Sequence, residues 1–309
     1  MSTAAGTAEQ QAFLAELVAH GHFLPSGEPG IYGRGAGFER VRTGFDGLVS
    51  RVAASDQADT PRFPPLIPRR TLERAGYLKS FPNLCGCVHS FAGNEFAAME
   101  LVDKASRAED WSMHLTPTDL VLVPAACYPA YPATAQRGPL PLGGVTLDLG
   151  GSYVYRNEPS GDPARLQMFH QREMVRIGNI DEVLDWRERW MKRAVEIFEQ
   201  VGLDALVEVA SDPFFGRGGR LLAKNQREMG LKFEVLVPIA SPERTAVTSF
   251  NYHQDHFGSV FAIRQHDGSV AHSACLGFGL ERVTLALFKK HGINSRDWPH
   301  PVRVVLGLV

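Results

Sequence analysis

The stretch "GSYVYRNEPSGDPARLQMFHQREMVRIG" (residues 151–178) decides the fold, because two β-rich runs flank a turn made of Pro, Ser, Gly and Asp. Residues two apart in a strand share one face. A hairpin here directs a cation, two carboxylates, an amide and an aromatic ring the same way, so it predicts a binding surface. Those alternate positions are Arg156 and Glu158 on the first run, and Phe169, Gln171 and Glu173 on the second.

The composition limits the class of protein. The chain has 309 residues, 44% hydrophobic and 21% charged, which is typical of a globular protein with a large core. Its net charge of −2 excludes the global basic excess that carries most nucleic-acid affinity. The N-terminus has no signal-peptide pattern, and no run reaches the ~18 apolar residues of a membrane helix. We therefore expect a cytoplasmic protein without membrane contact.

Strand signals dominate the second half of the chain. β-branched or alternating runs predict strands in "DLVLVP", "KFEVLVPI", "TAVTSFNY" and "SVFAIRQ", and their short connections imply antiparallel pairing. Asn179 and Glu182 form a capping-box pattern before a helix that ends at Gly202. Asn94 similarly precedes a helix over 95–111. These patterns predict an α+β fold, with an antiparallel sheet flanked by helices.

The N-terminal part differs in character. Residues 8–20 predict an amphipathic helix, and a stretch rich in Gly and Pro follows it. We therefore expect residues 1–60 to form a helical and loop appendage.

Further motifs flank the hairpin in a fixed order. "VLVPAACYPAYP" precedes it, "KFEVLVP" follows it, and "HSACLGFGLERVTLAL" places Gly277, Gly279 and Arg282 where a strand enters a helix. This set resembles the catalytic domain of class II aminoacyl-tRNA synthetases, most closely the seryl enzymes, over about residues 60–300. The hairpin is similar to their motif 2, "GFGLERV" to motif 3 and "KSFPNL" to motif 1. The resemblance implies a single class II synthetase-like catalytic domain spanning residues 1–309.

The resemblance also implies an ATP site. Arg156 would bind the α-phosphate, since a forked guanidinium neutralises charge on an attacked phosphorus, and Arg282 would hold the far phosphates. Both are the candidate catalytic residues. The family uses Mg²⁺ with ATP, but Ala246 occupies the place of a metal-binding carboxylate, which leaves the Mg²⁺ ligands unassigned. The other nucleotide-site candidates are Glu158, Arg165, Leu166, Phe169, Lys232, Thr248 and Ser249, together with Ala246 itself.

A zinc site follows from a departure from the ordinary seryl enzymes. They have a Thr-Ala-Glu loop that contacts the amino acid, whereas this chain has Ala125-Ala126-Cys127. With Glu173 and Cys275, Cys127 resembles the three-ligand zinc site of the atypical seryl-tRNA synthetases of methanogens. Three protein ligands leave a position open, as in catalytic zinc sites, and the resemblance implies that a substrate amine binds there. Glu173 thereby also becomes a substrate-site residue.

Two other sets of residues are alternative candidates for a metal site or for substrate contacts. Cys85 and Cys87, with His89, offer a Cys-x-Cys-x-His pattern, which we interpret as buried interface thiols rather than a metal site. His253 and His256 flank Asp255, and they fit either satisfied polar groups at a strand end or substrate contacts.

The acceptor of the activated amino acid is inferred from what the chain lacks. Seryl-tRNA synthetases carry a long tRNA-binding arm before the catalytic domain, and here there are no sustained heptads and no basic stripe. This resembles the amino acid:[carrier protein] ligases, which load glycine or alanine onto the phosphopantetheine thiol of a carrier protein instead of tRNA. A synthetase that recruits its RNA arm in trans and a non-catalytic paralogue remain the alternatives.

Two surfaces complete the expectations. Residues 215–230 predict an inserted basic helix, which we interpret either as a dock for an acidic carrier protein or as a solvated helix face. Its cations are Arg217, Arg220, Lys224 and Arg227. The motif 1-like segment 79–91 is apolar, and class II catalytic domains pair through this region. We therefore expect a homodimer.

Overall fold

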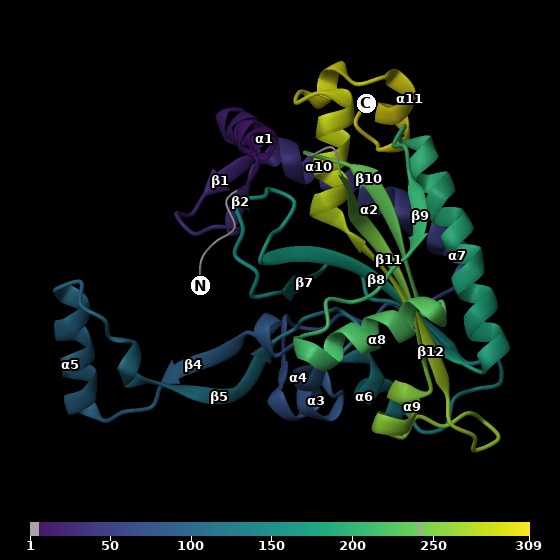
Figure 1. Ribbon diagram of the computed structural model, residues 1–309, viewed down its shortest axis with the longest axis horizontal. Helices are drawn as coiled ribbons and strands as arrows, with labels where there is room; N and C mark the ends of the chain where they lie inside the picture. Colours follow the sequence, from purple (N-terminus) through teal and green to yellow (C-terminus); the bar gives the residue numbers. More distant parts are fainter. Residues whose placement is uncertain (1–5, 241–242) are drawn as a thin grey trace.

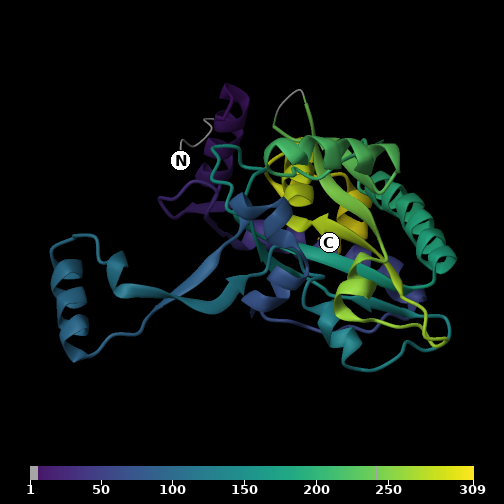
Figure 2. The same ribbon diagram turned by 60° about the horizontal axis from the view of Figure 1, so that its bottom comes forward.

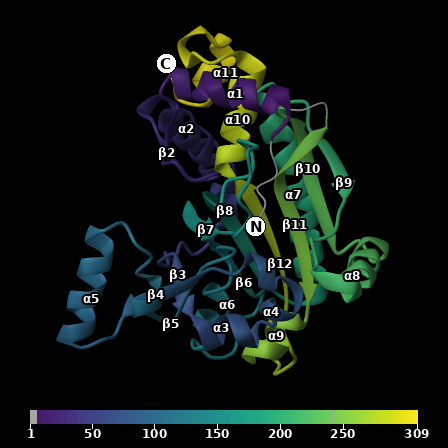
Figure 3. The same cartoon turned by 60° about the vertical axis from the view of Figure 1, so that its left-hand side comes forward.

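The computed structural model describes residues 6–240 and 243–309, except for the side chain of Arg217. The first five residues of the N-terminus considered above lie outside this range. The centre of the molecule is a seven-stranded sheet with the order β6-β8-β12-β11-β10-β9, in which β7 also pairs with β8 (Figures 1 and 3). Every strand pair in it is antiparallel. The expected α+β architecture is confirmed.

Two smaller sheets accompany the central one, with the orders β3-β5-β4 and β1-β2. The strands are β1 (Phe23–Pro25), β2 (Tyr32–Arg34), β3 (Leu66–Pro68), β4 (Cys87–Phe91), β5 (Leu115–Leu122), β6 (Val145–Asp148), β7 (Ser152–Tyr155), β8 (Met168–Gly178), β9 (Leu206–Val209), β10 (Lys232–Pro238), β11 (Arg244–Gln254) and β12 (His272–Gly279). The α-helices are α1 (Ala8–Ala19), α2 (Ala36–Ala53), α3 (Arg69–Arg74), α4 (Tyr77–Ser80), α5 (Glu95–Ser106), α6 (Ala130–Ala135), α7 (Ile180–Gln200), α8 (Gly216–Glu228), α9 (His256–Phe261), α10 (Leu280–His291) and α11 (His300–Val305).

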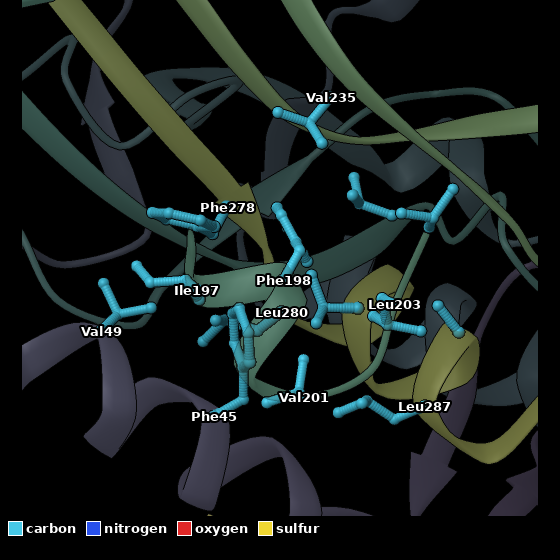
Figure 4. Close-up of a cluster of buried hydrophobic side chains, with 14 of the residues drawn as sticks. Phe45, Val49, Ile197, Phe198, Val201, Leu203, Val235, Phe278, Leu280 and Leu287 are labelled. Carbon is cyan, nitrogen blue, oxygen red and sulfur yellow. The ribbon is translucent and has the colours of Figure 1, made fainter. Parts of the chain in front are cut away.

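The main core lies between one face of the sheet and the helices α2, α7 and α10 (Figure 4). Helix α7 begins at the expected capping box, in which Asn179 Oδ1 accepts from Glu182 N at 2.9 Å and Glu182 Oε2 accepts from Asn179 N at 3.3 Å. Its buried apolar stripe comprises Val183, Trp186, Trp190, Ala194, Ile197 and Phe198.

The N-terminal part is not an appendage. Helix α2 places Phe38, Phe45 and Val49 in the main core, where Phe45 stacks on Phe198 at 6.0 Å between ring centroids. The glycines near the start of α2 made the sequence resemble a loop. A further glycine, Gly44 in the middle of the helix, is needed because a Cβ would lie 2.3 Å from the carbonyl oxygen of Leu306.

Two other local expectations were wrong. "SVFAIRQ" (residues 259–265) is not a strand, because α9 extends through Phe261, with Phe257 and Gly258 buried. A Cβ on Gly258 would lie 1.9 Å from the carbonyl oxygen of Ala271, so the glycine permits this close approach. Helix α5 has the expected Asn94 cap but ends at Ser106, before the expected boundary.

Helix α5 sits at the tip of an arm. Strands β4 and β5 extend from the body and carry α5 away from it (Figure 2). None of its residues is buried, and the exposed fractions of Phe96, Met99 and Val102 are 79%, 64% and 63%. The arm therefore presents an apolar surface. Among the described residues, no helix is both long enough and apolar enough to cross a membrane.

Candidate functional site

The candidate site begins with a row of residues across four strands. The register pairs Glu234 of β10 with Ser249 of β11, Ser249 with Gly277 of β12, and Gly277 with Glu173 of β8. Paired residues in an antiparallel sheet lie on the same face. Since neighbouring side chains alternate, this face is opposite to the one that carries Phe278 into the main core. The sheet thus separates the site from the core.

Cys127, Glu173 and Cys275 come together on this face. One ligand atom from each lies within 4.8 Å of the others, and this is the group that the described residues offer for a metal ion. Their exposed fractions are only 3%, 2% and 3%. Two sulfurs and a carboxylate oxygen are a donor set that zinc accepts, and three protein ligands leave room for a fourth. The residues fit the zinc site that the sequence implies.

Hydrogen bonds orient the side chains of Glu173 and Cys275. The backbone N–H of Cys127 donates to Glu173 Oε2 at 2.7 Å, which ties the loop after β5 to β8. Asn251 Nδ2 lies 3.6 Å from the Cys275 sulfur, and His253 Nε2 lies 3.5 Å from the same sulfur. Such outer contacts fix the direction of metal ligands.

Without a metal, these groups favour their protonated forms. Burial raises the pKa of Glu173, although hydrogen bonds with the two thiols oppose this. A hydrogen bond with Cys275 lowers the pKa of Cys127, but burial and the Glu173 carboxylate outweigh it and raise that pKa to about 11. The hydrogen bond with Cys127, burial and Glu173 all raise the pKa of Cys275. A buried cluster of this kind is stabilised when a cation replaces the protons.

The cluster lies in a pocket of about 640 Å³. The predicted site residues that line it are Cys127, Arg156, Glu173, Lys232, Ser249 and Cys275. Lys232 is buried, and its Nζ lies 2.7 Å from Asp212 Oδ1 and 2.9 Å from Glu234 Oε1. The fold therefore brings one phosphate-binding candidate and all three metal candidates into one cavity.

Arg156 and Glu158 are not on a strand, contrary to the expectation. β7 ends at Tyr155, and the N–H of Arg156 donates to Gln167 O at 2.8 Å as the chain enters the loop. Glu158 then forms an ion pair with Arg165 at 2.8 Å. The β pattern predicted a strand that includes Glu158, whereas the observed strand ends at Tyr155 and the chain turns from there.

Arg282 is held beside this loop. Its Nε donates to Ala164 O at 2.8 Å and its Nη1 to Ala246 O at 3.0 Å. Burial and the nearby cations Arg156 and Arg165 lower the pKa of Arg282 to about 10. Three guanidinium groups that repel one another form a region of positive potential suited to a polyphosphate.

The remaining nucleotide-site candidates have different surroundings. Leu166 belongs to the main hydrophobic core and is 7% exposed, which does not fit the expectation that it frames the nucleotide. Phe169 is half-buried and packs against both core clusters. Thr248 is buried, and its hydroxyl has no hydrogen-bond partner in the described structure. Ala246 contributes only its carbonyl oxygen, to Arg282.

The competing residues stay outside the cluster. In the single chain Cys87 is exposed and Cys85 is half-buried, so their burial at an interface between chains stays a prediction. A β-bulge separates Cys87 from His89, so the two do not follow regular strand alternation. His256 is used structurally, with Nε2 at 3.0 Å from Ala75 O. His253, by contrast, lies beside the metal candidates.

Sequence reasoning missed Asn251 and Asp212. Asn251 follows Ser249 at period two on β11, so the alternation that identified Glu173 also applies to it. Asp212 lines the pocket from the loop after β9. No sequence pattern indicates it, because its position depends on how that loop folds back over the sheet.

Comparisons with known proteins agree with this geometry. No family model matches the chain. The fold is that of the class II aminoacyl-tRNA synthetases: a seryl-tRNA synthetase from M. kandleri, solved with tRNASec from A. aeolicus, matches 96% of this chain and 60% of its own, with a TM-score of 0.79 and 22% identity. A prolyl-tRNA synthetase from Giardia lamblia, solved with prolyl-adenylate, matches 94% of this chain and 55% of its own, with a TM-score of 0.68 and 13% identity.

The sequence comparison narrows the class. Amino acid–[acyl-carrier-protein] ligases 1 and 2 of Bradyrhizobium diazoefficiens are 45% identical over 98% of this chain and 46% identical over 93% of it, covering 92% and 85% of their own lengths. The chain belongs to this family of ligases. A type-2 serine–tRNA ligase of Methanopyrus kandleri is 27% identical over 86% of this chain, which spans about half (53%) of that enzyme.

Proposed function

We propose that the protein activates a small amino acid with ATP and transfers it to the phosphopantetheine thiol of an acidic carrier protein. Family membership supports the reaction class. The observation that carries the proposal is the single pocket that holds Arg156 together with the Cys127, Glu173 and Cys275 cluster. An amino acid with its amino group at the cluster and its carboxylate toward Arg156 would be aligned for attack on phosphorus.

The charged residues suit the first half-reaction, which forms an aminoacyl-adenylate and pyrophosphate. Attack of the carboxylate on the α-phosphorus creates negative charge that Arg156 is placed to neutralise. Arg282 stays beside it through two backbone carbonyls, so its guanidinium needs little reorganisation to receive the pyrophosphate side. The Glu158–Arg165 pair lies on the same loop, and we assign it to the nucleotide.

The cofactors are zinc, held by the cluster, and Mg²⁺. Zinc bound by Cys127, Glu173 and Cys275 would offer an open coordination position, which prefers a neutral nitrogen donor such as an α-amine. For Mg²⁺, the described residues gather no second set of three acidic or thiol ligands. Mg²⁺ commonly binds through substrate phosphates with few protein ligands, so we assign it to ATP.

The amino acid is proposed to be glycine or alanine. The ligand cluster is almost fully buried, and Tyr131 packs close to it, with its hydroxyl 3.4 Å from His253 Nδ1. The assignment itself rests on the resemblance to ligases that load glycine or alanine. ATP–pyrophosphate exchange with glycine, alanine, serine and leucine tests this assignment, and exchange as fast with leucine as with glycine would contradict it.

The carrier protein is proposed to dock on α8. Arg220, Lys224 and Arg227 are exposed on this helix, and Lys224 forms only a surface ion pair of 3.6 Å with Glu228. A local basic face on a nearly neutral protein attracts an acidic partner over a long range. Figures 1 and 3 show α8 beside the sheet that carries the site.

We further propose that the enzyme is a homodimer that uses the arm formed by β4, α5 and β5. Its apolar helix face has no partner within the described part of the chain. Large exposed apolar surfaces commonly mark interfaces between protein chains. The four free cysteines and the need for ATP favour the cytoplasm.

Formation of a thioester on the carrier protein tests the proposed function. The purified protein, ATP and labelled glycine or alanine should label a carrier that bears phosphopantetheine, and neutral hydroxylamine should release the label because it cleaves thioesters. The same carrier without its prosthetic group is the matched control and should stay unlabelled. Equal labelling of both carrier forms would contradict the proposed thiol acceptor.

A further inference from the structure

Helix α8 contributes Leu222 and Gln226 to the pocket wall, and a reciprocal pair of side-chain hydrogen bonds ties it there. The N–H of Asp212 donates to Gln226 Oε1 at 2.7 Å, and Gln226 Nε2 donates to Asp212 Oδ2 at 2.8 Å. This pair joins the last turn of α8 to the loop that leads into the helix. We call these two residues the latch.

The latch continues into the pocket. The second oxygen of Asp212 accepts from Lys232 Nζ at 2.7 Å, and Lys232 also pairs with Glu234. Asp212 and Lys232 both line the catalytic pocket. An unbroken series of polar contacts therefore runs from α8, through Asp212, to the strand β10 below the site.

Few other contacts among the described residues hold α8 against the body, so we expect the latch to fix the position of the helix. Gly219 is buried within α8, whereas most of its other described side chains are exposed, and the helix has no side-chain N-cap. The preceding loop is fixed to the opposite pocket wall, where Phe214 stacks on Phe81 at 5.3 Å and Phe215 N donates to Ser80 O at 2.8 Å. Without the latch, the last turn of α8 around Gln226 would be free to move, whereas the loop before the helix would stay in place.

We propose that Gln226 is a positioning residue that fixes α8 against the catalytic pocket through Asp212, so that a carrier protein docked on α8 delivers its thiol to the adenylate. The inference rests on the proposed function. Gln226 reaches the wall of the pocket, but its side-chain hydrogen bonds go to Asp212 and not to the metal cluster, Arg156 or Arg282. Its contribution therefore belongs to the transfer step, after activation.

This role has a kinetic signature that differs from that of a docking residue. Removing charge from Arg220 or Lys224 weakens encounter with the carrier and raises its KM. Removing the latch leaves those charges present but lets the docked carrier take many orientations. A misplaced nucleophile lowers the turnover at saturating carrier, because orientation supplies much of the rate.

The test uses Gln226→Ala in the full-length protein, with Asn225→Ala as the matched control. Asn225 is the adjacent amide on α8, it is exposed, and its side chain takes no part in the latch. We expect Gln226→Ala to lower kcat for loading of the carrier at least tenfold, with carrier KM within threefold and ATP–pyrophosphate exchange within twofold of wild type. Asn225→Ala should match wild type in all three. Gln226→Met, of similar volume, provides the same test if the alanine variant does not fold.

Each result decides the matter. Loading at the wild-type kcat by the Gln226 variant would overturn the latch and leave the proposed function intact. Exchange that falls as far as loading would also overturn it, because Gln226 would then support the whole pocket. If the wild-type protein performs exchange but loads no carrier bearing phosphopantetheine, the proposed acceptor fails, and the inference fails with it.

Discussion

Replacing Cys127 by serine should separate the metal from the enzyme. The substitution exchanges one sulfur for a smaller oxygen that stays protonated, at a site where the three ligand atoms lie within 4.8 Å of one another. The backbone N–H of Cys127 would still donate to Glu173, so the loop after β5 should keep its place. The variant thus tests the ligand rather than the fold.

The magnitude follows from the number of ligands. Four-ligand structural zinc sites are worth about 10–16 kcal/mol, which is roughly 3 kcal/mol per ligand. Since about 1.4 kcal/mol corresponds to a tenfold change in affinity, loss of one thiolate should weaken zinc binding about 100-fold or more. The free energy of unfolding of the zinc-free protein should change by only about 1 kcal/mol, as for an ordinary small substitution.

Zinc content by elemental mass spectrometry and amino-acid-dependent ATP–pyrophosphate exchange should fall together in Cys127→Ser. Cys87→Ser is the matched control, because it makes the same chemical change at an exposed cysteine outside the cluster. It should retain both zinc and exchange. Full exchange by a zinc-free Cys127→Ser protein would refute the reasoning, as would loss of zinc from Cys87→Ser.

Three further predictions concern the dock, the arm and the latch. Reversing charge at Arg220 and Lys224 should raise carrier KM several-fold at low salt, and added salt should imitate it in the wild type; an unchanged KM at low salt would move the dock elsewhere. Phe96→Asp should convert a 68 kDa dimer, twice the 34.0 kDa chain mass, to a monomer in sedimentation equilibrium. The control Leu142→Asp, at another exposed position, should remain a dimer. A Phe96→Asp protein that remains a dimer would exclude the arm as the interface. Burial raises the pKa of Asp212, but Lys232 outweighs this and holds that pKa below the usual 3.8. The ion pair between Asp212 and Lys232 therefore stabilises the folded protein above pH 3.8, and this stabilisation is lost as the pH falls through the pKa of Asp212 in the folded state. Asp212→Asn should therefore lower the free energy of unfolding by about 1–3 kcal/mol at pH 7 and by less near pH 3, measured by urea unfolding, and an equal loss at both values would contradict this.

Much of the fold follows from local patterns in the sequence. The capping box at Asn179 and the stripe through Trp186 identify α7, since both depend on residues within one helix. Period-two alternation on β8 correctly directs Glu173 toward the site. Helix α2 escaped prediction because glycines weaken its helical pattern, and at least Gly44 is required by a close contact with a distant chain segment.

The site itself is less accessible to sequence reasoning. Cys127, Glu173 and Cys275 come from separate elements, and only the pairing of β8 with β12 and the fold of the loop after β5 bring them together. The spacing of these residues in the sequence does not indicate a cluster, and the prediction came from the resemblance to a known family. Asp212 and Gln226 illustrate the same limit, because their contact depends on how a loop and α8 fold over the sheet.

One competition measurement tests the central claim most directly. The protein, ATP and labelled glycine or alanine are mixed with equal concentrations of total tRNA and a carrier protein that bears phosphopantetheine, and the two acceptors are then separated and counted. The account predicts label on the carrier, as a hydroxylamine-sensitive thioester, and only background on the RNA. Label on tRNA with none on the carrier would contradict it.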